Sequence, residues 1–244
     1  MSDEIKKTVD EVVEDLFKDS KSTTEQIVEL PSRGLGYPGG KSKVTIRTMT
    51  FEDEKAISES TPDQDIVNLM ISRCSEGVDI DSLYSADKIF LLFKLRELSY
   101  GSSIKVSRKC DSCKKDNNLD IDMSQLEVIY VDDDFKDPKE VLLPDLDKTI
   151  SIRLPRSSDI DSLSTKSKIL TNLWRFVVKL DKYSDPKIFS AVIKKLSSRD
   201  TRKILESLLV DDFGLQNRAK FICSECGSEN VVEVPITEAF FTVS

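Results

Sequence analysis

Two pairs of cysteines in this sequence have the residue type and the spacing of metal ligands. Cys110 and Cys113 form the first pair and Cys223 and Cys226 the second, with two residues between the thiols of each pair. Two such pairs on the tips of two hairpins are the ligand set of a zinc ribbon, in which four thiolates hold one tetrahedral metal ion. The spacing therefore predicts one structural metal site, with zinc as the preferred ion, although iron also fits a cage of four sulfurs.

A metal ion held by four cysteines has no open position for water or substrate, which indicates a structural site and not metal catalysis. Two other arrangements also fit the sequence: buried or redox-active thiols that never meet, and a structural disulfide. The disulfide is disfavoured because no signal peptide opens the chain and the cysteine usage indicates a reducing cytoplasm. Cys74 is expected to be a small apolar residue near the end of a helix.

The composition argues against several classes of protein. The chain has 244 residues and no histidine, which removes Ser-His-Asp and Cys-His catalysis, histidine general bases and histidine metal ligands. The net charge of −8 disfavours a general nucleic-acid binder, because phosphate contacts need a basic surface. No apolar run is long enough to span a bilayer. We therefore predict a protein that is not an enzyme, lies outside membranes and binds protein partners.

Alternating apolar residues predict the hairpins that would carry the cysteines. Ile104 and Val106 precede the first pair, and Leu119 and Ile121 follow it, each with a polar residue between. Apolar stretches also flank the second pair. The predicted fold class is α+β: a zinc-ribbon-like pair of β-hairpins with a long, mainly helical insertion at 124–218, plus an N-terminal helical region. The metal would then couple ion binding to folding of the whole C-terminal half.

The insertion is expected to contain short strands followed by helices. Strand-like patterns occupy 141–143 and 149–154, and the outgoing arm of the first hairpin is expected to continue through 126–131. Helical spacing predicts one helix from about 158 to 180, with further helices after Pro186 and after Asp200.

The N-terminal part divides into two further regions, so the predicted domains are 1–27, 28–103 and 104–244. Residues 1–18 form an acidic amphipathic helix followed by a polar linker. We predict that Val9 and Leu16 on its apolar stripe bind a partner. The second region should hold a strand at 43–49 and several helices, of which the apolar helix over 86–100 should be central to the core.

A glycine-rich segment lies at 29–42. Its end, Gly40-Lys41-Ser42, resembles a phosphate-binding loop, but Leu35 stands where that motif requires its first glycine, and a strand follows instead of a helix. We interpret the segment as an ordered loop and not as a nucleotide site. Leu35 and Tyr37 would attach it to the core or to a partner.

Three features together resemble the baseplate hub family of T-even-type tailed phages. They are the segment 30–37, the strand 44–50, and the paired cysteines with helices between them. The resemblance covers about residue 28 to the end. It implies a non-enzymatic role in building the hub of the tail baseplate, as a hub component or a hub assembly factor. It also implies other baseplate hub proteins or the tape-measure protein as partners, and a location in the host cytoplasm during assembly or in the virion tail baseplate.

The alternative function is a zinc-ribbon nucleic-acid-binding regulatory protein. Zinc ribbons often bind nucleic acid, and basic residues surround the first cysteine pair, namely Lys105, Arg108, Lys109, Lys114 and Lys115. A solvated hairpin tip explains the same residues, because the chain as a whole is acidic and the patch lacks aromatic residues for base stacking.

Overall fold

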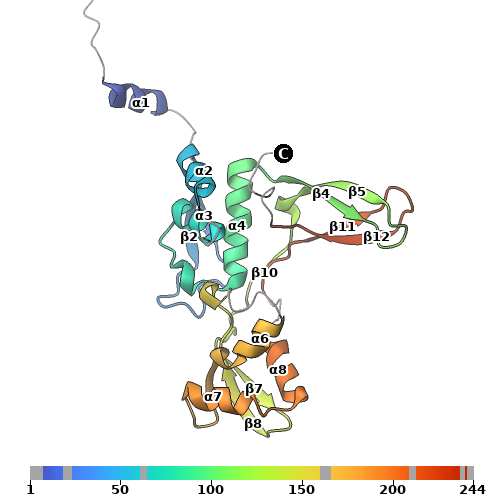
Figure 1. The fold of residues 1–244 in the computed structure, drawn as a ribbon. Helices are drawn as coiled ribbons and strands as arrows, with labels where there is room; N and C mark the ends of the chain where they lie inside the picture. Colours follow the sequence, from blue (N-terminus) through green and yellow to red (C-terminus); the bar gives the residue numbers. More distant parts are fainter. Residues whose placement is uncertain are drawn as a thin grey trace, which may run out of the picture.

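The computed structural model describes residues 8–18, 24–60, 65–159, 166–208, 213–236 and 240. It has three parts, a central body, a long arm and a lower lobe, and a helix at the N-terminus stands apart from them (Figure 1). The start of the predicted N-terminal helix, most of the polar linker and part of the helix predicted at 158–180 lie outside the described residues.

The central body packs helices on a small antiparallel sheet with the strand order β1-β2-β3. Its strands are β1 (Glu25–Glu29), β2 (Lys43–Arg47) and β3 (Ser75–Glu76). Its helices are α2 (Phe51–Ser58), α3 (Ile66–Cys74) and α4 (Ser85–Tyr100). The predicted strand and helices of this region are confirmed. Sequence patterns gave no sign of β1, and the predicted boundary between residues 27 and 28 falls inside this strand.

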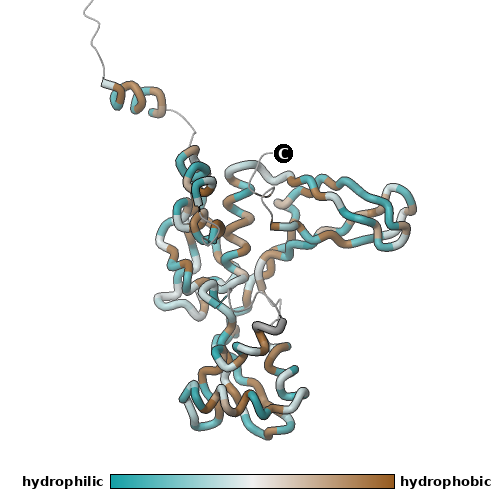
Figure 2. The backbone as a smooth tube through the Cα atoms, viewed as in Figure 1, coloured by the Kyte–Doolittle hydropathy of each residue, from teal (hydrophilic) through white to brown (hydrophobic). Residues whose placement is uncertain are grey.

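Helix α4 runs through the centre of the body, as its apolar sequence predicts. Phe90, Leu91, Leu92 and Leu95 are all buried in the main core, and Figure 2 shows hydrophobic residues alternating with hydrophilic ones along this central helix. Gly101 ends it with a φ of 86°, a conformation that costs glycine little. None of the helices within the described ranges has both the length and the apolar character that a membrane span requires.

The arm consists of two antiparallel hairpins from distant parts of the chain. The first pairs β4 (Ser103–Lys109) with β5 (Asp116–Asp122), and the second pairs β11 (Arg218–Ile222) with β12 (Glu229–Glu233). Apolar residues on alternate positions, such as Ile104, Ile121 and Val232, join the core of the body. The strand pairings thus confirm both predicted hairpins. The alternation of apolar residues determines which face of each hairpin is turned inward.

The lower lobe is formed by the segment between the hairpins and has a hydrophobic core of its own. A three-stranded antiparallel sheet holds β7 (Lys139–Leu143), β8 (Lys148–Ile152) and β9 (Val177–Leu180). The helical elements are α6 (Lys166–Asn172), the 3₁₀ helix η4 (Leu173–Phe176), α7 (Pro186–Ile193) and α8 (Ser198–Leu208). A further short sheet pairs β6 (Val128–Ile129) with β10 (Gly214–Leu215).

The prediction that a helix continues to residue 180 is wrong at the C-terminal end of that helix. Residues 177–180 form β9, which pairs with β8 so that Ile152 lies opposite Val177. The backbone groups of this stretch, which begins with two β-branched valines, form hydrogen bonds at the edge of a sheet and not within a helix.

A buried polar cluster joins the lower lobe to the body. Asp137 accepts hydrogen bonds from the Tyr84 hydroxyl at 2.7 Å and from Leu154 N at 2.9 Å, and forms an ion pair with Arg156 at 2.6 Å. The Arg156 guanidinium lies 3.6 Å from the centre of the Tyr84 ring. Because each of these polar groups has a partner, the junction is fixed by specific contacts.

Candidate metal centre

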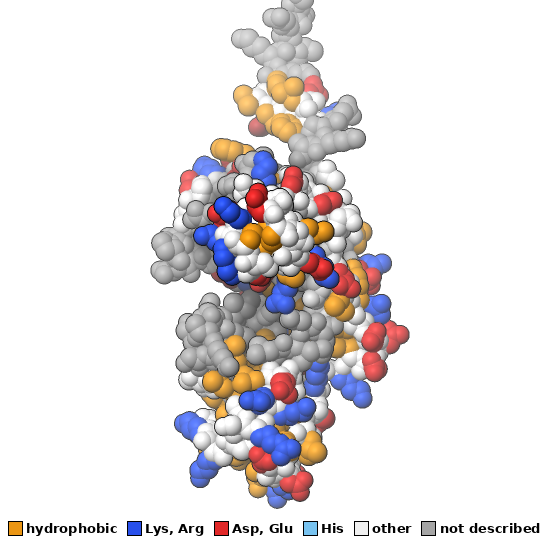
Figure 3. All heavy atoms as spheres, turned by 90° about the vertical axis from the view of Figure 1, so that its right-hand side faces the viewer, with side chains coloured by type: hydrophobic (Ala, Val, Ile, Leu, Met, Phe, Trp, Pro, Cys, Tyr) orange, Lys and Arg blue, Asp and Glu red, His pale blue; other side chains and the backbone are white. Residues whose placement is uncertain are grey.

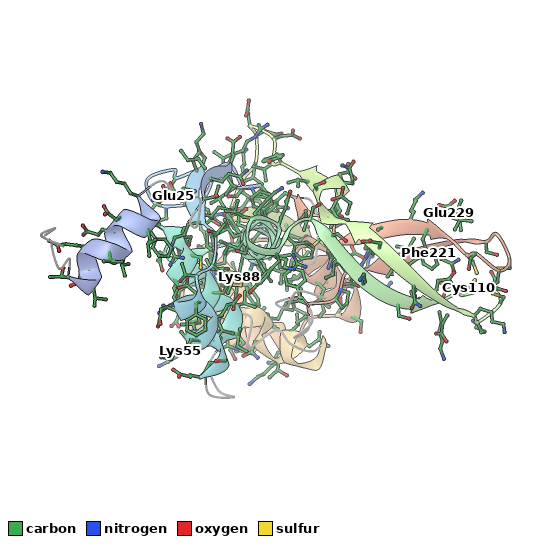
Figure 4. The ribbon with its side chains drawn as sticks, turned by 90° about the horizontal axis from the view of Figure 1, so that it is seen from above. Glu25, Lys55, Lys88, Cys110, Phe221 and Glu229 are labelled. Carbon is green, nitrogen blue, oxygen red and sulfur yellow. The ribbon has the colours of Figure 1, made fainter. Side chains whose placement is uncertain are left out.

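The four cysteines of the two pairs meet at the tip of the arm. Their sulfur atoms all lie within 4.8 Å of one another, and Figure 4 shows Cys110 at the far end of the arm. The Sγ atoms of Cys110 and Cys226 are 3.6 Å apart, and those of Cys113 and Cys223 are 3.7 Å apart. A tetrahedron with metal–sulfur bonds of 2.3 Å has edges of about 3.8 Å. The set therefore fits a four-thiolate metal site.

The convergence rules out the two other arrangements that the sequence left open. All five cysteines are free, and the separations above far exceed a disulfide bond of about 2.05 Å. The fifth, Cys74, is buried in the core of the body, as expected for a small apolar residue.

Each cysteine pair lies in a tight turn of the same form. Lys114 N donates to Cys110 O at 3.0 Å in the first turn, and Gly227 N donates to Cys223 O at 3.0 Å in the second. Lys114 has a φ of 64° and Gly227 a φ of 71°. The left-handed conformation of Gly227, which glycine adopts readily, thus recurs at a lysine in the first hairpin.

The turns direct backbone N–H groups at the sulfurs. The N–H groups of Cys113 and Ser112 lower the pKa of the Cys110 thiol to about 6. Those of Cys226 and Glu225 likewise lower the pKa of Cys223. At Cys113 the N–H of Lys115 acts in the same direction, but burial and the neighbouring thiols raise its pKa to about 12. Thiolates are the form that binds a metal, so binding of an ion at this site would release protons from the thiols.

Sequence reasoning missed two buried asparagines beside the sulfurs. The side-chain N–H of Asn117 points to Cys223 Sγ at 3.6 Å, and that of Asn230 points to Cys110 Sγ at 3.5 Å. The signal was present, because each asparagine stands four positions after the second cysteine of its own pair.

The predicted partner-binding residues Val9 and Leu16 lie on α1 (Val9–Phe17). The helix begins with a capping box in which Thr8 N donates to the Glu11 carboxylate at 2.7 Å. Val9 is 79% exposed and Leu16 71% exposed, and no residue of α1 is buried. Figure 2 shows one hydrophobic and one hydrophilic side of this helix. Partner binding stays a prediction for both residues.

The other two predicted partner-binding residues, Leu35 and Tyr37, are half-buried and pack against their own chain. The Tyr37 hydroxyl donates to the Asp87 carboxylate at 2.5 Å and accepts from Tyr84 N at 2.8 Å. The loop is therefore attached to the core, and a role in partner binding stays a prediction.

Acidic residues lie among the basic residues at the tip of the arm. Arg108 forms an ion pair with Asp111 at 3.1 Å, and Lys114 donates to the carbonyl of Asp111. Lys220 on the second hairpin forms an ion pair with Glu229 at 3.0 Å. The end of the arm in Figure 3 shows blue, red and orange side chains intermixed. Such a mixed surface is a poor match for a phosphate backbone.

The chain was compared with known protein families, curated proteins and solved structures. A family model described as "T4 bacteriophage base plate protein" matches residues 33–242. No curated protein and no solved structure matches the chain.

Proposed function

This chain belongs to the family of T4 bacteriophage base plate proteins, and we propose that it is a non-enzymatic component or assembly factor of the baseplate hub that acts by binding other tail proteins. The observation that carries the proposal is the extent of the family match, which runs from residue 33 to 242 and so includes the arm, the lobe and all of the body except β1. Its partners are other baseplate hub proteins or the tape-measure protein. It meets them in the host cytoplasm during assembly or stays with them in the virion tail baseplate.

The N-terminal helix supports binding by an exposed apolar stripe. It precedes the part of the chain that the family model matches. Its exposed apolar residues repeat at helical spacing, namely Val9, Val12, Val13, Leu16 and Phe17, and acidic residues lie between them. A stripe of this kind suits a groove on a partner, into which the helix buries its apolar side. Leu35 and Tyr37 would present the glycine-rich loop as a second, smaller contact.

The metal centre supports a scaffold role. We propose zinc as its ion, because four cysteine sulfurs at near-tetrahedral separations are its usual structural ligand set, with iron as the competing occupant. Four thiolates leave no position for water or substrate. The ion would hold together two hairpins that are separated by about a hundred residues, and so fix the arm as a rigid projection.

The test is co-purification from phage-infected cells. Tagged wild-type protein should retain baseplate hub proteins or the tape-measure protein. A variant with Val9→Asp and Leu16→Asp should lose them, because two charges interrupt the apolar stripe. The matched control is Val178→Asp on the lower lobe, where Val178 is 43% exposed; it should retain the same partners.

A wild-type protein that emerges alone from infected cells and is missing from purified tails would overturn the proposed function. Retention of the same partners by the doubly charged variant would leave that function in place and contradict the role of α1 as a binding surface.

A further inference from the structure

The two hairpins of the arm repeat one unit, Cys-x-x-Cys-x-x-x-Asn. Asn117 ends the unit in the first hairpin and Asn230 ends it in the second. Both are polar residues on strands next to the cysteine turns, yet their exposed fractions are only 5% and 4%. Burying an amide is unfavourable unless its donors and acceptor find partners, so each of these two side chains is expected to make specific hydrogen bonds.

Asn117 reaches from its own hairpin into the turn of the other. Its Nδ2 donates to Lys115 O at 3.1 Å within the first hairpin and to Cys223 Sγ at 3.6 Å in the second. Its Oδ1 accepts a hydrogen bond from Ser224 N at 3.2 Å. The amide orientation follows from these partners, because a carbonyl oxygen can only accept and a backbone N–H can only donate.

Asn230 makes the same contacts in the opposite direction. Its Nδ2 donates to Ser228 O at 2.8 Å within the second hairpin and to Cys110 Sγ at 3.5 Å in the first. Its Oδ1 accepts from Asp111 N at 2.8 Å. Each asparagine thus holds the backbone that follows the first cysteine of the opposite turn, and donates to the sulfur of that same cysteine.

We propose that Asn117 and Asn230 are a symmetric pair of positioning residues for the metal centre, each of which orients and stabilises the buried thiolate of the opposite hairpin. The inference rests on the proposed metal site. A divalent ion with four thiolates carries net negative charge, which N–H donors at the sulfurs reduce. Outer partners of this kind also fix the direction of the ligand, and their loss typically weakens metal binding by about 10–100-fold.

The test compares Asn117→Asp, Asn230→Asp and Asn118→Asp in the full chain. Aspartate keeps the shape of asparagine but replaces the donor with a negative charge. Asn118 is the matched control, because it is exposed on the same strand, so Asn118→Asp adds the same charge outside the site. The affinity for zinc is measured by competition with a chromophoric chelator, and cobalt serves as a spectroscopic probe of the sulfurs.

We expect Asn117→Asp and Asn230→Asp each to weaken zinc binding by about 10–100-fold relative to Asn118→Asp, and by similar factors because the two turns are equivalent. At saturating cobalt their thiolate-to-cobalt absorption should shift to longer wavelength, since sulfur lone pairs without N–H donors lie higher in energy. This shift separates an effect at sulfur from a general loss of stability.

Zinc affinities and cobalt spectra equal to those of Asn118→Asp would overturn the asparagine proposal while leaving the metal site intact. A wild-type chain that binds neither zinc nor cobalt would instead remove the metal site itself, and the proposal with it.

Discussion

Asp53, a buried carboxylate at the start of α2, accepts several charge-assisted hydrogen bonds. It accepts from Arg47 Nη1 at 2.7 Å, from Arg73 Nε at 2.8 Å and from Thr50 N at 2.9 Å. Burial raises the pKa of Asp53, but the hydrogen bonds from Arg47 and Thr50 outweigh it and hold that pKa well below its usual value. A carboxyl with a lowered folded-state pKa stabilises the fold above its unfolded pKa of about 3.9 and loses that contribution as the pH falls further.

Asp53→Asn should therefore lower the free energy of unfolding at pH 7 by about 1–3 kcal/mol. The difference from wild type should shrink as the pH is lowered below about 4, because the Asp53 carboxyl is then protonated in the unfolded chain while it is still ionised in the folded one. Urea unfolding at several pH values measures this. Glu52→Gln, at an exposed neighbour, is the control and should change little. A difference that is constant between pH 7 and pH 2 would contradict the assignment.

Tyr37 offers a second test at the residue scale, because its hydroxyl serves two partners at once. Burial raises the pKa of Asp87, and this carboxyl receives the hydroxyl of Tyr37 as well as Ser32 N at 3.0 Å. Tyr37→Phe keeps the ring but leaves buried polar groups unpaired, so we expect a loss of about 1–3 kcal/mol of stability. Tyr130→Phe, at an exposed ring, should be neutral in the same denaturation experiment. Equal stability of the two variants would show that the Tyr37 hydroxyl bonds do not contribute.

Among the elements, the arm depends most directly on the cysteines. Cys110→Ser should release the metal, and amide hydrogen exchange should then increase in β4, β5, β11 and β12, because the two hairpins are no longer tied at their tips. Cys74→Ala is the control: it removes a buried sulfur from the body and should lower stability while leaving the metal in place. Unchanged exchange in the arm of the Cys110→Ser variant would mean that packing alone holds the hairpins together.

The elements also show what sequence patterns can and cannot predict. The hairpins and α4 could be predicted because the local pattern of apolar residues shows which positions are buried. In the first hairpin, for example, Ile104 and Val106 occupy alternate positions and both face inward. The strand β9 could not be predicted, since its identity depends on pairing with β8 more than twenty residues earlier, and an apolar run alone fits a helix as well. The convergence of the cysteines was predictable from spacing. The asparagines were not recognised, because only the structure places each beside the sulfur of the other hairpin.

At the scale of the whole molecule, the lower lobe has a hydrophobic core separate from that of the body and arm. From the sequence, ion binding was expected to be coupled to folding of the entire C-terminal half. The separate core of the lobe predicts instead that the lobe unfolds independently of the metal centre. Phe176→Ala, at a fully buried ring of the lobe, should lower the lobe's stability by about 3–5 kcal/mol while the protein retains its metal.

Calorimetry together with metal analysis checks this prediction. The lobe variant should show an earlier, separate transition, and Tyr183→Ala, at an exposed ring of the same lobe, should not. Release of the metal in that earlier transition would show that lobe and arm unfold as one unit.

The measurement that tests the central claim most directly is the metal content of the purified wild-type chain, determined by elemental analysis beside Cys110→Ser. Convergence of four sulfurs on one ion predicts one zinc per chain in the wild type, little or none in the variant, and a lower melting temperature once the metal is lost. A metal-free wild type that melts at the same temperature as the variant would contradict the claim that an ion holds the arm together.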